Sequence, residues 1–347
     1  MRNHGLDLKA AGVVMFTRSF PLFSIFGFRI SVDLSWFVLA VLIVWSLATG
    51  LFPESLPERS AQTYYLMGTV AALGMFASIV FHELAHSLVA RIYGIKIAGI
   101  TLFIFGGVAE LEDEPPTPKS EFLVAIAGPI SSVVLGGAFY LIAILFETSS
   151  PPEVLAVLSY LTVINIVLAV FNLVPAFPLD GGRMLRAALW WRQGDLRKAT
   201  RLASLLGAAL GIALMAFGAY NSFQGALIAG MWQILIGYFV FNAAGNARRQ
   251  TEIIERLRGV NVSQLMRTPP NMPAGVPVEP PTGATLTADQ SAIGALRQLL
   301  RGPRSEALVL ANGKAVGVIS TRDIFGFLNR QTASRGAENA QRDRGRA

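Results

Sequence analysis

The chain of 347 residues contains no cysteine and only three histidines, which are His4, His82 and His86. The absence of cysteine excludes disulfides and any zinc site built on thiolates. The shortage of histidine argues against a three-histidine metal site within one chain. A metal bound by His82 and His86 would therefore take a carboxylate as its third protein ligand.

Charged residues are also scarce. They make up 15% of the chain, whereas ordinary soluble domains contain about 25%. Hydrophobic residues make up 53%, which predicts that the larger of two domains is embedded in a membrane. The net charge of +7 comes mainly from basic residues beside apolar segments, a placement that favours membrane orientation. We expect a lipid bilayer and no nucleic acid among its partners.

Six apolar segments are each long enough, at about 20 residues, to span a bilayer. Lysine and arginine concentrate in alternate connections between them, so the positive-inside rule predicts both termini on the cytoplasmic side. The first apolar run begins late and is long enough to span, which argues against a cleavable signal peptide. We expect a multi-pass protein of a prokaryotic plasma membrane. The predicted spans are Val32–Phe52, Tyr64–Tyr93, Phe122–Phe146, Val154–Ala176, Ala203–Tyr220 and Gly225–Ala244.

The second predicted span contains the pentapeptide His82-Glu83-Leu84-Ala85-His86, in its cytoplasmic half. This spacing places two imidazoles one helical turn apart on one face, beside a carboxylate. The pattern is typical of a catalytic zinc site, in which Glu83 acts as general base and not as a ligand. The alternative is a pair of polar residues at a helix–helix interface. Three ionisable side chains within a span would then need several partners.

The third ligand is expected in another apolar segment, which ends in the sequence FNLVPAFPLDGGR around Asp180. Pro175 and Pro178 prevent a regular helix there, and Gly181-Gly182 allow the backbone to turn tightly around the carboxylate. Broken helix at membrane depth is where polar sites are built. Alternatively, Asp180 caps the helix that follows, and both roles could coexist.

Two asparagines, Asn165 and Asn172, lie seven residues apart on one face of the fourth predicted span. Either amide could donate a hydrogen bond to a substrate carbonyl or to a developing oxyanion. An ordinary interhelical hydrogen bond is the alternative for both, and more so for Asn165.

Residues Ile97–Glu112 are rich in β-branched and aromatic residues and include Gly106-Gly107. The segment is too short for two more spans, so it predicts a β-ribbon or a re-entrant loop, buried in protein or lining a wet cavity. The glycine pair would allow a tight turn or close backbone approach.

The sequence changes character after Arg249. Thr251–Arg258 predicts a charged helix, and Pro269–Pro281 is a proline-rich break. A compact α+β pattern follows, with helices near Asp289–Leu300 and Asp323–Asn329. Between them, the turn Asn312-Gly313 joins the predicted strands Ala307–Ala311 and Ala315–Ser320, a strong hairpin signal. The tail Gln331–Ala347 is polar and predicted to be disordered.

The membrane part resembles the site-2 protease family of intramembrane zinc metalloproteases, over roughly Phe23 to Ala244. The resemblance rests on the motifs FHELAHSLVA, FGGVAEL, Glu121 with the following AIAGP, and FNLVPAFPLDGGRMLRA. It implies one Zn²⁺ per chain, bound by His82, His86 and Asp180, with Glu83 as general base. It also implies substrate handling by Asn172 and Pro178, and an extended substrate strand presented near Gly106 and Gly107.

The C-terminal part resembles a cystathionine-β-synthase (CBS) module, with VSQLM from Val262 as its opening and GVISTRDI from Gly317 as its close. That resemblance implies that Thr321 and Asp323 contact an adenosine nucleotide. Such modules work in pairs and the chain shows only one, which suggests a homodimer through these modules and puts nucleotide binding in doubt. A small structural or dimerising domain is the alternative.

We therefore expect an α-helical polytopic membrane protein with about six transmembrane helices, a re-entrant β-ribbon and a small cytoplasmic α+β domain. The predicted parts are residues 1–249, 250–330 and 331–347. The expected function is hydrolysis of a peptide bond in a transmembrane segment of a membrane-anchored substrate, as in regulated intramembrane proteolysis. The alternative is a transporter or channel gated by the CBS-like module. Transporters often contain matched pairs of broken helices, and the single Pro/Gly-broken segment here has no counterpart, which argues against a transporter or channel. The presence of Glu83 argues against a third alternative, a non-proteolytic scaffold.

Overall fold

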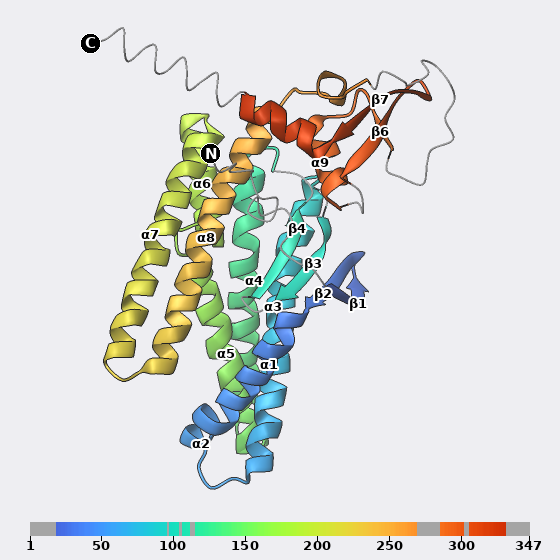
Figure 1. The fold of residues 1–347 in the computed structure, drawn as a ribbon. Coiled ribbons are helices and arrows are strands. Elements are labelled where there is room, and N and C mark those ends of the chain that lie inside the picture. The colour runs from blue at the N-terminus through green and yellow to red at the C-terminus, as the bar shows by residue number, and fades with distance from the viewer. Residues whose placement is uncertain are drawn as a thin grey trace, which may run out of the picture. The chain divides into compact units, whose positions relative to one another are not determined.

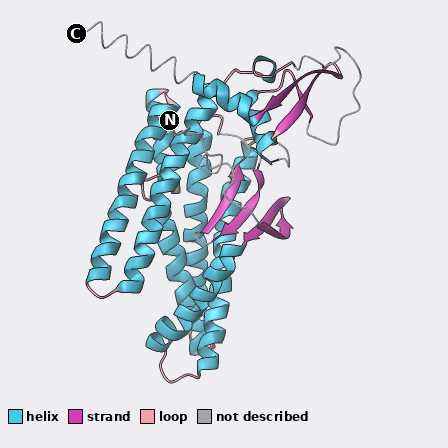
Figure 2. Cartoon of the chain, viewed as in Figure 1, coloured by secondary structure: helices cyan, strands magenta, loops and turns pink. Residues whose placement is uncertain are grey.

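The computed structural model describes residues 19–95, 97–103, 106–111, 115–268, 285–301 and 305–330. The chain divides into two compact units, one over Phe16–Ala247 and the other from Arg248 onward. The proline-rich break and the tail predicted at Gln331–Ala347 lie outside the described residues. Figure 1 shows the order of the elements along the chain, and Figure 2 shows that helices dominate the first unit.

The first unit is built on long helices whose beginnings are set by polar caps. Asp33, Ser60, Thr117 and Asp195 each accept a hydrogen bond from a backbone N–H of the following turn, which satisfies donors that a helix start leaves unpaired. The helices are α1 (Leu34–Ser46), which continues through a π-helical turn (Leu47–Leu51) into α2 (Phe52–Ser55), then α3 (Ala61–Ile92), α4 (Pro118–Leu145), α5 (Pro152–Asn172), α6 (Asp180–Gln193), α7 (Leu196–Phe223) and α8 (Leu227–Leu257).

Five described helical segments have the length and apolar composition needed to cross a bilayer. They overlap the first five predicted spans and are Leu34–Ser55, Ala61–Ile92, Pro118–Leu145, Pro152–Asn172 and Leu196–Phe223. The sixth predicted segment, Gly225–Ala244, overlaps α8. This helix does not end near Ala244 but runs on to Leu257, so it includes all of the charged stretch predicted at Thr251–Arg258 except Arg258.

Four strands form one sheet beside the helices, in the order β1-β2-β3-β4. The predicted β-ribbon is confirmed as the antiparallel hairpin of β3 (Ile97–Phe103) and β4 (Gly106–Leu111). The hairpin β1 (Ser19–Ile25) and β2 (Phe28–Asp33) was not predicted, and β2 pairs with β3 in parallel. Ile30 and Ile100 of this sheet are buried against Leu84 of α3, which fixes the sheet beside the pentapeptide.

The second unit contains a three-stranded sheet in the order β5-β6-β7. Its elements are β5 (Thr285–Thr287), α9 (Ala292–Arg301), β6 (Glu306–Ala311), β7 (Lys314–Ser320) and a helix over residues 321–330. The predicted Asn312-Gly313 turn is confirmed, because both residues have a positive φ, as such hairpin turns require. Buried residues of α9, β6 and β7, among them Leu299, Val309 and Ile319, form its core.

Candidate active site

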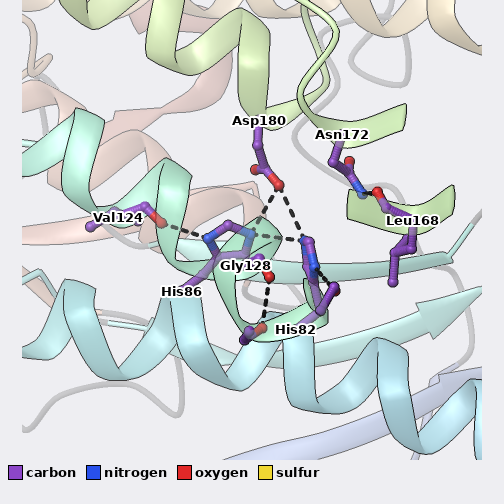
Figure 3. Close-up of polar contacts among 9 residues, drawn as sticks. His82, His86, Val124, Gly128, Leu168, Asn172 and Asp180 are labelled. Atoms are coloured by element: carbon purple, nitrogen blue, oxygen red, sulfur yellow. Dashed lines mark hydrogen bonds and ion pairs between the residues drawn. The ribbon is translucent and has the colours of Figure 1, made fainter. Parts of the chain in front are cut away.

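The two histidines of the pentapeptide lie one turn apart on α3, and both side chains are buried. Their Nε2 atoms are 3.1 Å apart and point toward a common partner (Figure 3). That partner is Asp180, whose Oδ2 lies 3.2 Å from His82 Nε2 and 3.1 Å from His86 Nε2. Residues 94 or more positions apart in sequence therefore meet at one point, as the sequence predicted.

Asp180 is the first residue of α6, after the irregular turn that follows α5. The turn is held from α7, because the Phe177 N–H donates to the Ala203 carbonyl at 3.2 Å. A side chain on Gly181 or Gly182 would collide with the backbone of the preceding turn, so both glycines are required for its tightness. The Asp180 carboxylate faces the histidines, and no side chain caps α6, so the alternative of a helix cap is wrong.

The other ring nitrogen of each histidine is held by α4. His86 Nδ1 lies 2.6 Å from the Val124 carbonyl, and His82 Nδ1 lies 2.8 Å from Ser132 Oγ. A carbonyl can only accept, so His86 carries its proton on Nδ1 and leaves the Nε2 lone pair free. Metal-binding histidines are oriented by this kind of outer contact. Sequence reasoning did not find these two partners, because neither carries a motif of its own.

The geometry fits a zinc ion. With Zn–ligand bonds of 2.0–2.1 Å, the ligand atoms of a tetrahedral site lie roughly 3.3 Å apart, close to the 3.1–3.2 Å separations seen here. Gly128 of α4 leaves the space open, since a Cβ there would lie 2.5 Å from His82 Nε2 and closer still to His86 Nε2. Two imidazoles and one carboxylate form a catalytic type of donor set, with a fourth position left for water or substrate.

Glu83 lines the same cavity as the three candidate ligands, and the cavity has a volume of about 180 Å³. Gly107 of β4 lies directly against Glu83, because a Cβ on Gly107 would approach Glu83 Cγ to 2.8 Å. Asn172, Pro178 and Arg183 also line this cavity. Gly106 is the first residue of β4 and pairs with Phe103.

The two asparagines have different surroundings. Asn172 lines the cavity, and its Nδ2 donates to the Leu168 carbonyl of its own helix at 3.0 Å (Figure 3). Asn165 is fully buried and donates to Ser78 Oγ of α3 at 3.0 Å. Asn165 therefore makes the interhelical hydrogen bond that was its alternative, whereas Asn172 lies in the wall of the cavity.

A buried ion pair joins the helices that carry the site. Arg186 of α6 donates to Glu121 of α4, with Arg186 Nε 2.6 Å from Glu121 Oε1, and its guanidinium lies 5.1 Å from the centre of the Phe177 ring. Glu121 is completely buried. The pair ties the helix bearing Asp180 to the helix that orients the histidines. Its two members lie 65 residues apart, so no local pattern indicated the contact.

In the second unit, Thr321 and Asp323 lie at the start of the helix over residues 321–330. Asp323 Oδ2 accepts from the Ser320 N–H at 2.9 Å and Oγ at 2.6 Å, and Asp323 Oδ1 accepts from Arg267 Nε at 2.8 Å. Partial burial raises the pKa of Asp323, but these hydrogen bonds and the Arg267 charge outweigh it and hold the pKa below its ordinary value. The carboxylate predicted to contact a nucleotide thus caps a helix here.

The chain resembles a family of peptidases in sequence. The profile of Peptidase family M50 matches residues 70–153 and 147–215. Rip3 of Mycobacterium tuberculosis is 39% identical over 256 residues, and the match covers 74% of this chain and 65% of Rip3, so the chain spans just under two thirds of that relative. The protein sll0528 of Synechocystis sp. is 35% identical over 303 residues, covering 87% of this chain and 76% of that protein. Both names describe zinc metalloproteases.

Among solved structures, a site-2 protease from Methanocaldococcus jannaschii matches with a TM-score of 0.46 and 30% identity, covering 67% of this chain and 95% of that one. The family assignment rests on the sequence matches and agrees with the resemblance seen in the motifs. The apolar helices make this an integral membrane protein. With the profile covering all three candidate ligands and a relative matched over most of both chains, the protein belongs to Peptidase family M50.

Proposed function

We propose that the chain is an intramembrane zinc metalloprotease that hydrolyses a peptide bond within a transmembrane segment of a membrane-anchored substrate. One observation carries the proposal. His82, His86 and Asp180 converge in a buried triangle, with Glu83 in the same cavity and apolar helices around it. Buried ionisable groups at membrane depth are expensive and mark functional sites.

His82, His86 and Asp180 would hold the zinc ion, with their orientation set by Ser132 and Val124. When bound, zinc acts as a Lewis acid and lowers the pKa of a water ligand to about 7. Glu83 accepts the proton of the attacking water and passes it to the leaving amine nitrogen. Asn172 faces the cavity and can exchange its bond to Leu168 for one to the substrate backbone.

The substrate would lie along β4. This strand is at the edge of its sheet and places Gly107 against Glu83. A transmembrane helix must unwind before a peptide bond can reach the site, and strand pairing satisfies the backbone groups that unwinding exposes. Gly106 and Gly107 keep this part of the edge free of bulk, and Pro178 forms part of the wall of the same cavity.

The topology that we propose has six transmembrane helices, with α8 as the sixth, and both termini in the cytoplasm of a prokaryotic cell. It is supported by the distribution of lysine and arginine among the connections. Cleavage would then occur near the cytoplasmic end of the substrate helix, as in regulated intramembrane proteolysis.

We further propose that the C-terminal unit is a CBS-like regulatory module that pairs with the same module of a second chain. The strand and helix order of residues 285–330 supports this. An adenosine nucleotide at Thr321 and Asp323 would have to compete with the Ser320 and Arg267 contacts of that carboxylate.

The test is substrate trapping with Glu83→Gln in the full-length protein. The variant should bind one equivalent of zinc, measured by mass spectrometry of the metal in purified protein. It should also retain membrane-anchored proteins that wild type releases as fragments cut within an apolar segment. His82→Ala is the matched control and should lose the zinc. Absence of zinc from wild type, or ion flux through reconstituted protein without proteolysis, would contradict the proposal.

A further inference from the structure

Arg183 is a charged residue in the active-site cavity to which the mechanism above gives no role. It lies on α6 three residues after Asp180, so both side chains project from the same face of the helix. It lines the cavity together with Glu83 and is half-buried. Across the described residues, no hydrogen bond or ion pair of its guanidinium is found.

The next arginine on α6, in contrast, has a structural role. Arg186 lies three residues further on and is buried, paired with Glu121 and placed near the Phe177 ring. Its charge is thus satisfied within the fold. Arg183 lies three positions before Arg186 in the sequence. Unlike Arg186, it lines the cavity.

The guanidinium is half-buried beside Glu83, and no hydrogen bond to another described residue occupies its N–H groups, so these donors are free to bind a ligand in the cavity. Arginine offers only donors and no acceptor. The ligand must therefore present an oxygen that carries negative charge, or acquires it.

The position of Arg183 in the cavity limits what that ligand can be. Arg183 shares the wall of one cavity with Glu83 and with the candidate metal ligand Asp180. A peptide group that reaches these residues enters the same cavity as the guanidinium. A donor in this wall can therefore reach the reacting peptide group itself.

We propose that Arg183 is a catalytic residue that donates a hydrogen bond to the carbonyl oxygen of the scissile peptide as this oxygen becomes negative. The inference rests on the proposed function and assigns the oxyanion donor of that reaction. A fixed cation where charge develops, away from bulk water, stabilises the transition state more than the ground state.

The water oxygen forms a bond to the carbonyl carbon, and Glu83 takes one water proton. The π electron pair of the carbonyl moves onto its oxygen, which accepts an N–H from Arg183. The electron pair then returns, the C–N bond breaks, and the amine nitrogen leaves with the proton from Glu83. The second water proton stays on the product acid until the regenerated Glu83 carboxylate accepts it and releases it to solvent. The resulting carboxylate stays within reach of the same guanidinium.

The experiment uses acetohydroxamate as the probe, because this small anion presents a carbonyl oxygen and a negative oxygen on adjacent atoms. Full-length protein is loaded with Co²⁺, and acetohydroxamate binding is followed by the visible absorption of the bound ion. We expect Arg183→Gln to weaken binding roughly 10- to 100-fold, the effect of losing one charge-assisted hydrogen bond. Cobalt content should be unchanged.

Arg192→Gln is the matched control, because Arg192 lies on the same helix but is exposed, and it should bind the probe as wild type does. Arg183→Met keeps the apolar stem and gives a second measurement if the glutamine variant does not fold. Wild-type affinity in a cobalt-loaded Arg183 variant would overturn the proposal. So would loss of the cobalt, since Arg183 would then support the metal ligands.

Once a substrate is trapped, Arg183→Gln should lower kcat by roughly 10²-fold with little change in KM. A rise in KM alone would assign Arg183 to substrate binding and contradict an oxyanion role. The acetohydroxamate experiment needs no substrate. It can therefore contradict the role of Arg183 even if trapping succeeds, and it can support that role even if trapping yields no substrate.

Discussion

The substitution Gly128→Ala should abolish tight zinc binding while leaving the helices intact. The new Cβ would lie 2.5 Å from His82 Nε2, whereas real Cβ contacts essentially never fall below 3.0 Å. The His82 imidazole must therefore move away by at least the difference, 0.5 Å. The His86 imidazole must move further, because the new Cβ would lie closer still to its Nε2. Zinc sites keep their bond lengths within about 0.2 Å, so the required shift exceeds what the site can absorb.

We expect a loss of zinc affinity of at least about 100-fold, the upper end of what the loss of an outer contact costs. The measurement is competition of purified protein against a chromophoric chelator, with metal content read in parallel. Gly137→Ala on the same helix is the matched control, because nothing lies within 4 Å of a Cβ at that position. Wild-type zinc affinity in the Gly128→Ala protein would refute the assignment of this space to the metal.

Three further outcomes are expected. Ser132→Ala removes the partner of His82 Nδ1 and should weaken zinc binding by roughly 10- to 100-fold in the same competition assay, and an unchanged affinity would contradict the orienting role. Glu121→Gln leaves Arg186 buried without a counter-charge and should destabilise the helical unit by about 3 kcal/mol or more, seen as a lower thermal midpoint of tryptophan fluorescence in detergent. The pKa of Asp323 is held low, so its stabilising effect is present above the unfolded-state pKa of about 3.9 and is lost as pH falls through the lower folded-state pKa. Acid should therefore unfold the second unit with a smaller pH dependence in Asp323→Asn, measured by circular dichroism, and an equal dependence would contradict the assignment.

That His82, His86 and Asp180 meet as candidate metal ligands could be predicted from sequence, because simple rules single these residues out. The spacing of His82 and His86 determines their shared face, and the count of histidines leaves a carboxylate as the third ligand. Asp180 stood out because prolines and glycines break an apolar segment around it. The spacing and the broken segment are local features and the histidine count needs only composition, so none of these inferences required a contact between distant segments.

The features that sequence reasoning missed depend on contacts between distant segments. Strand β2 pairs in parallel with β3, about seventy positions later in the chain, so nothing beside Ser19–Asp33 announces the pairing. The sequence favoured an interhelical hydrogen bond for Asn165 over Asn172, but only the position of α3 shows that its partner is Ser78. Gly128 is required because two imidazoles from another helix occupy the space above it.

The turn that carries Asp180 is held by a hydrogen bond from Phe177 to the carbonyl of Ala203, so α7 acts on the metal site through the backbone. Gly207, one turn further along α7, lies so close to Phe177 that no side chain would fit between them. A sideways displacement of α7 would therefore move the turn that carries Asp180. If Asp180 binds zinc as proposed, zinc affinity would report the position of α7.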